Sequence, residues 1–113
     1  MARVLNPANW GGDAAVTMTA AGTTTATAAT VTADHVLVDV VTSSADGVIL
    51  RALNAGEICS VGNIDATETL KVYPPSGAKI NGRTADLPMA VPQGKAALFI
   101  FLNATNLIGI CSV

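Results

Sequence analysis

The residues that could carry out chemistry are few and lie apart in the sequence. His35 is the only histidine, and it follows Asp34 at the start of a valine-rich segment. Histidine acts as a general base when a nucleophile lies within hydrogen-bond reach and another group orients the imidazole. Adjacent residues on a strand point to opposite faces, so Asp34 would not orient His35. We therefore interpret His35 as a structural residue near the surface.

Metal and redox chemistry have no better support. Cys59 and Cys111 are distant from each other and from His35, whereas structural zinc sites need clustered ligands. We expect both thiols to be free and buried, packing as small hydrophobic groups. Asp65 and Glu68 share one loop without the carboxylate alternation of a calcium loop, so we interpret them as solvated charges. The sequence therefore predicts a protein that is not an enzyme and binds no cofactor or metal.

Composition limits the class of protein further. The chain has 113 residues, of which 50% are hydrophobic and 12% charged, with a net charge of −2. This composition predicts one globular domain and excludes a mostly disordered chain. The six cationic residues are scattered, which argues against nucleic-acid binding. The longest C-terminal stretch without charge, residues 96–113, contains Asn103, Thr105 and Asn106, so we expect no membrane segment. Residues 1–12 do not resemble a secretory signal.

Alternating apolar residues separated by Gly, Pro, Asn and Asp predict short strands every 8 to 12 residues. This spacing is typical of an all-β fold, and we predict an antiparallel β-sandwich or flattened barrel, jelly-roll-like. Segment 95–102 is apolar on both faces, so we expect it at the centre of a sheet. Segments 57–61 and 69–73 are expected to form a hairpin. The expected strands are residues 35–42, 48–53, 57–61, 69–73, 87–91, 95–102 and 107–113, and the expected core is Val38, Val48, Leu50, Ile58, Leu70, Val72, Leu98, Phe99, Ile100 and Ile110.

The N-terminal part differs in composition from the rest. Residues 1–13 lack periodicity and contain the only tryptophan, Trp10, so we predict an irregular N-terminal arm followed by a single β-domain, residues 14–113. Residues 14–33 are mainly Ala and Thr, and the β-branched threonines favour strands, including an extended segment 23–32. Their small side chains suit either a subunit contact or a plain edge strand over the core. Trp10 suits either an anchor in a partner or a lid over its own domain.

Residues 22–110 resemble small all-β proteins and domains of tailed-bacteriophage virions. The resemblance is carried by Gly22-Thr23-Thr24-Thr25-Ala26-Thr27-Ala28, by Gly47-Val48-Ile49-Leu50, and by Asn63 ahead of Leu70-Lys71-Val72-Tyr73-Pro74. Its firmest part is Val72-Tyr73-Pro74-Pro75-Ser76-Gly77-Ala78-Lys79-Ile80-Asn81-Gly82, followed by a turn at Gly94 and the strand containing Phe99. The sequence departs from the family at Leu107, where relatives usually carry an aromatic residue.

The resemblance implies a non-enzymatic structural virion protein, a capsid decoration or cement protein. It implies a homotrimer on the capsid surface, made in the host cytoplasm and bound to the major capsid protein. The alternative is a tail or fibre module or a receptor-binding module of the particle, because such units serve both roles. The low charge independently favours self-association. We expect partner contacts at Arg3, Val4, Leu5, Trp10, Thr23, Thr25 and Thr27.

Overall fold

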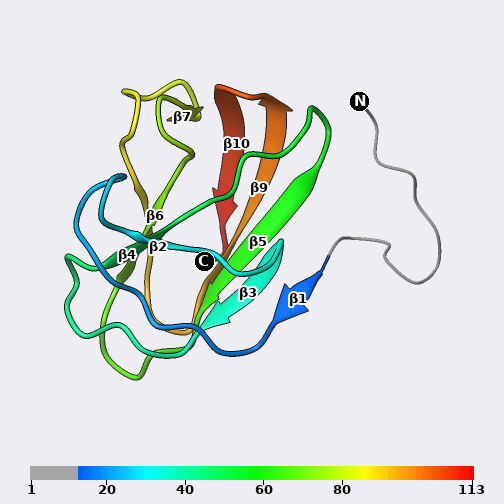
Figure 1. Cartoon of the computed structure of the whole chain (residues 1–113). Coiled ribbons are helices and arrows are strands. Elements are labelled where there is room, and N and C mark those ends of the chain that lie inside the picture. The colour runs from blue at the N-terminus through cyan, green and yellow to red at the C-terminus, as the bar shows by residue number, and fades with distance from the viewer. Residues whose placement is uncertain (1–12) are drawn as a thin grey trace.

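A computed structural model describes residues 13–113 and shows an all-β chain. One sheet has the strand order β1-β3-β5-β9-β10-β7, and a second has the order β2-β4-β6-β8. The two sheets lie on opposite sides of a shared interior, as Figure 1 shows. The strands are β1 (Ala14–Ala15), β2 (Ala29–Thr30), β3 (His35–Val38), β4 (Gly47–Ile49), β5 (Ile58–Asn63), β6 (Leu70–Tyr73), β7 (Lys79–Ile80), β8 (Met89–Val91), β9 (Ala96–Asn103) and β10 (Asn106–Cys111).

The strands stack as a β-solenoid of about four turns, so the prediction of an antiparallel β-sandwich or jelly-roll-like barrel is wrong. The chain passes alternately between the sheets, and each new strand lies parallel to the one two positions earlier: β1, β3 and β5 in one sheet, and β2, β4 and β6 in the other. Five of the eight strand pairs of the described residues are parallel. The all-β class is confirmed.

Antiparallel pairing is confined to the last part of the chain. Strand β8 pairs with β6 and strand β9 with β5 in the antiparallel sense, and β9 and β10 form a hairpin. Strands β8 and β9 therefore occupy the edges of β6 and β5, where a further parallel coil would otherwise pair. The hairpin expected from residues 57–61 and 69–73 is absent, because β5 and β6 belong to different sheets.

Local turn signals were interpreted correctly. Gly77 has a φ of 85°, and the Ala78 N–H donates to the Pro75 carbonyl at 2.9 Å, which closes the expected proline-rich turn. Asn81 and Gly82 have φ values of 56° and 72°, as an Asn-Gly turn requires. The extended segment expected at residues 23–32 is wrong: its first half is a turn in which the N–H of Ala28 donates to the carbonyl of Thr24, and only β2 is a strand.

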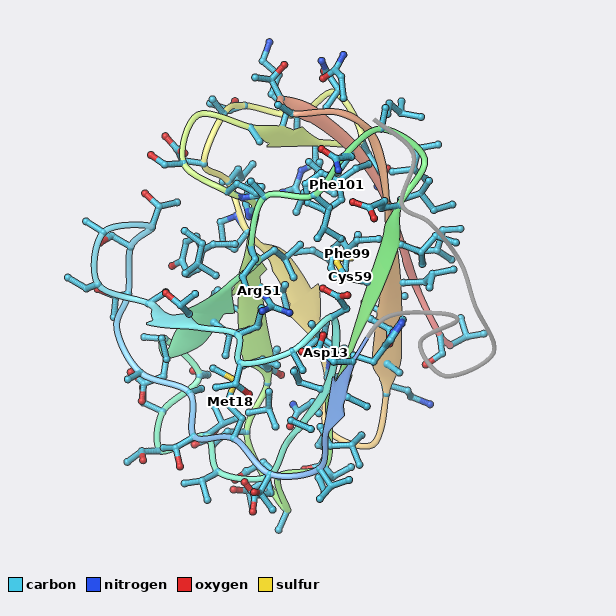
Figure 2. The ribbon with its side chains drawn as sticks, turned by 45° about the vertical axis from the view of Figure 1, so that its right-hand side comes forward. Asp13, Met18, Arg51, Cys59, Phe99 and Phe101 are labelled. Atoms are coloured by element: carbon cyan, nitrogen blue, oxygen red, sulfur yellow. The ribbon has the colours of Figure 1, made fainter. Side chains whose placement is uncertain are left out.

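The interior is a single layer of apolar side chains between the sheets. Phe99 and Phe101 of β9 are fully buried there, and Figure 2 shows them beside Cys59 in the space between the sheets. The predicted core residues Val38, Val48, Leu50, Leu70, Val72 and Phe99 are buried, which confirms that part of the prediction.

The other four predicted core residues do not belong to this layer. Ile58, Leu98 and Ile110 are exposed and Ile100 is half-buried. They occupy alternate positions to the buried Cys59, Phe99 and Ala97, and therefore point out of the solenoid. Strand β9 is central in its sheet, as expected, but among residues 13–113 only one of its two apolar faces is fully buried.

Replacing Phe99 with Ala should lower the free energy of unfolding by about 3–5 kcal/mol, because the change leaves a cavity between the sheets. Denaturant unfolding at one fixed protein concentration measures the loss. The control is Ile64→Ala at a side chain that is 51% exposed after β5, where we expect less than about 1 kcal/mol. Equal losses in both variants would contradict the interior position of Phe99.

Candidate functional site

Several polar side chains that could take part in catalysis or binding instead connect consecutive turns, or coils, of the solenoid. The Arg51 Nη2 atom lies 3.0 Å from Asp34 Oδ1 and 3.2 Å from Asp13 Oδ1, and Figure 2 shows Arg51 directed toward Asp13. The Asp13 carboxylate also accepts a hydrogen bond from the Asp34 N–H at 2.9 Å. This bond, aided by the Arg51 charge, lowers the pKa of Asp13 below its usual value. Asp13 precedes β1, Asp34 precedes β3, and Arg51 follows β4. Their contacts therefore join consecutive coils of the solenoid.

His35 and Ser60 form the only pairing of the described residues that resembles a base and a nucleophile. His35 Nδ1 lies 2.7 Å from Ser60 Oγ, on the outer side of strands β3 and β5. The neighbouring Asp34 carboxylate accepts a hydrogen bond from Arg51 Nη2 at 3.0 Å. The pair links neighbouring strands at the register position where His35 faces Ser60.

Both cysteines are free, as expected, but only Cys59 is buried, whereas Cys111 is half-buried. Cys59 lies on β5 beside Phe99 of β9, with its side chain in the interior. Burial raises the pKa of its thiol to about 12, with the charge of Asp34 acting in the same direction. A thiol that stays protonated at neutral pH is a poor nucleophile and a poor metal ligand. Within residues 13–113, no three side chains of His, Cys, Asp or Glu gather closely enough to hold a metal ion.

Asn63 and Asp65 organise the connection from β5 to β6. Asn63 is fully buried, and its Nδ2 donates to the carbonyls of Glu68 and Val91 at 2.8 and 2.9 Å. The Asp65 carboxylate accepts hydrogen bonds from the N–H groups of Val41, Thr67 and Glu68, and these lower the pKa of Asp65. Asp65 is thus a loop charge that is also bound to the backbone of its own loop and of the preceding coil.

The most distinctive surface is the outer side of the six-stranded sheet, which we call the aliphatic face. Across β5, β9 and β10 the register aligns Ile58 with Ile100 and Ile100 with Ile108, and aligns Leu98 with Ile110. On β3, Leu37 covers Gly62: a Cβ atom at Gly62 would lie 2.7 Å from Leu37 Cδ2. The aliphatic face consists of Leu37, Ile58, Leu98, Ile100, Leu102, Ile108 and Ile110, of which all but the half-buried Ile100 are 37–55% exposed.

The partner-binding residues expected from sequence lie elsewhere. Arg3, Val4, Leu5 and Trp10 lie outside the described residues. Thr23, Thr25 and Thr27 belong to the turn before β2, and the Thr27 Oγ1 accepts hydrogen bonds from the N–H groups of Thr23 and Thr24, both at 3.1 Å. The structure does not bring these threonines to the aliphatic face. The signal for that face was the apolar character of residues 95–102 on both sides, which we assigned to the core.

Comparison of the sequence with protein-family models, curated proteins and solved structures gave no match. No helix in the described part of the chain is long and apolar enough to cross a membrane.

The Asp65 carboxylate should make the stability of the protein sensitive to acid. Its folded pKa lies below the ordinary value of 3.8, so its contribution is complete above that pH and is lost as the pH falls through the folded pKa. Asp65→Asn should therefore unfold at a lower temperature than the wild type at neutral pH, and the difference should narrow below about pH 4. Thermal unfolding across this pH range measures it.

Asp46→Asn is the matched control, because it removes a carboxylate from the turn before β4. The Asp65 carboxylate and the three N–H groups that donate to it are unchanged in this variant. A difference between Asp65→Asn and the wild type that stays constant down to pH 2 would contradict the role given to Asp65.

Proposed function

We propose that this chain is a non-enzymatic structural protein of a tailed-phage particle, bound as a homo-oligomer to the outside of the capsid. The observation that carries the proposal is the aliphatic face, because large apolar surfaces on small proteins serve as interaction sites. The polar side chains of the described coils support it as well: Arg51, Asn63 and Asp65 are engaged in structural contacts. The virion context comes from the resemblance at residues 22–110.

A tail or fibre module is the second candidate function. The β-solenoid favours it, because a solenoid is built by stacking coils and can be extended within a longer chain. Strands β1 and β2 lie at the outer edges of their sheets at the N-terminal coil, where another strand could pair. The two candidates predict different positions on the particle.

Adding the purified chain to phage particles from which its gene has been deleted tests the proposal. We expect electron cryomicroscopy to show added density at regularly repeated positions on the outside of the shell. We also expect the decorated particles to withstand a higher temperature before releasing DNA, because a ligand that binds only the intact shell stabilises it. Density on the tail alone would support the second candidate, and no binding to either part would contradict both.

The N-terminal arm, residues 1–13, is proposed to dock onto the major capsid protein or an adjacent subunit, with Trp10 as the anchor. Asp13 at the end of the arm contacts Arg51 and Asp34 of its own domain. Deleting residues 2–12 should reduce binding to particles and leave the melting temperature of the free protein nearly unchanged, because Asp13 and its contacts with Arg51 and Asp34 remain. Trp10→Ala is the smaller change and should weaken binding by about tenfold or more. A lower melting temperature with unchanged binding per folded molecule would instead favour Trp10 as a lid over its own domain.

A further inference from the structure

We infer that the aliphatic face is the surface through which copies of this chain bind one another. The inference rests on the proposed function, which includes a homo-oligomer, and assigns that contact to β3, β5, β9 and β10. The sequence also allows a contact between copies through residues 17–32 or residues 74–92. In residues 17–32 the large apolar side chain Val31 is buried, and threonines are bound within a turn.

The aliphatic side chains form continuous rows across the sheet. One row runs from Ile58 through Ile100 to Ile108, and a second joins Leu98 to Ile110. Ser60 continues the second row on β5, and Leu37 extends the apolar surface over Gly62 to β3. Residues facing one another on neighbouring strands have Cβ atoms about 4.5–5.5 Å apart, so the rows leave no polar gap between β9 and β10 at these positions.

The lack of charge on the central strands of the face is compatible with contact between two identical faces. The outward positions of β5, β9 and β10 carry only uncharged side chains: beside the aliphatic residues they are Ser60, Gly62, Ala96 and Asn106. A partner recognised by charge, such as a nucleic acid or an acidic peptide, would find no complementary group on these strands. The aliphatic centre of this sheet is uncharged, and its titratable or charged neighbours are His35 on β3 and Lys79 on β7. An aliphatic centre packs favourably against an identical one, because interfaces between identical subunits are richer in apolar area than other interfaces.

The shape of the face also fits packing of sheet on sheet, and its size limits the strength of the contact. Four strands about 4.8 Å apart, the longest with eight residues at about 3.4 Å each, make a face of roughly 15 by 27 Å. Two such faces pack with their layers about 10 Å apart and their side chains interdigitated. The area is below the roughly 800 Å² per partner of a standard interface, so we expect an oligomer that dissociates on dilution. A twofold axis would pair two faces, and a threefold axis would bring three faces together.

Sedimentation equilibrium of the full chain at micromolar concentrations tests the inference. We expect the wild type to form a closed oligomer, and Leu98→Glu/Ile110→Glu to be monomeric, because charges at these neighbouring positions must be desolvated on contact. Both side chains are exposed in the single chain, at 38% and 55%, so the variant should keep its far-ultraviolet circular dichroism spectrum. The control Ile64→Glu introduces a charge at an equally exposed site off the face and should leave the oligomer intact.

Leu98→Thr/Ile110→Thr is a second variant for the case in which the glutamate variant does not fold, because threonine is favourable in strands. It should weaken association by about tenfold or more and leave the fold intact. The inference is overturned if the wild type is monomeric, or if the folded face variants keep the wild-type oligomer. A monomeric wild type that associates once residues 2–12 are deleted would show that the N-terminal segment occupies the face instead.

Binding of the same variants to particles separates this inference from the proposed function. A wild type that oligomerises through the face and does not bind particles would leave the inference standing and contradict the function. If the wild type binds particles and the substitutions at Leu98 and Ile110 leave its oligomer unchanged, the proposed function stands and this inference is contradicted.

Discussion

Each strand of this solenoid can bury only one of its two faces in the chain, because the two sheets enclose a single interior. Phe99, Phe101 and Val61 fill that interior from the six-stranded sheet, and Val48 and Val72 fill it from the other. Apolar burial is the main source of stability in such a domain, so this one layer determines the register of every strand pair. A slip by one residue would exchange the buried set of β9 for its outward set and leave Phe99 exposed.

The polar groups that are buried or half-buried follow from the same geometry. The chain crosses repeatedly from one sheet to the other, and backbone groups at these crossings lose their strand partners. Asn63 supplies hydrogen bonds to two carbonyls at one crossing, and Asp65 accepts three N–H groups beside it. Arg51 joins Asp13 and Asp34 at the beginning of two coils. Side chains that would be candidates for catalysis in another fold are thus used to close the solenoid.

Strand positions and turns were predictable because their signals are local, as in Asn81-Gly82 and in the strand containing Phe99. Strand direction was not predictable, because an alternating strand has the same pattern in parallel and antiparallel pairs. The coils also hide their repetition: Ala14 pairs with His35 and His35 with Ser60, steps of 21 and 25 residues, whereas Ala29, Val48 and Val72 are separated by 19 and 24. The expected Thr23, Thr25 and Thr27 contacts depended on an extended segment that is largely a turn.

The error over the core concerns the same residues as the aliphatic face, and its cause is informative. Ile58, Leu98, Ile100 and Ile110 were assigned to the core because they look like buried residues, and in the single chain they lie on an outer surface. A sheet surface in permanent contact with water usually carries charged or polar side chains, which protect it against unwanted association. Sequence pattern reflects burial in the working assembly, whereas the structure of one chain reports burial within that chain. An aliphatic alternation kept on both faces of β9 is therefore the pattern expected of a strand that lies between the interior of its own subunit and a second layer outside it.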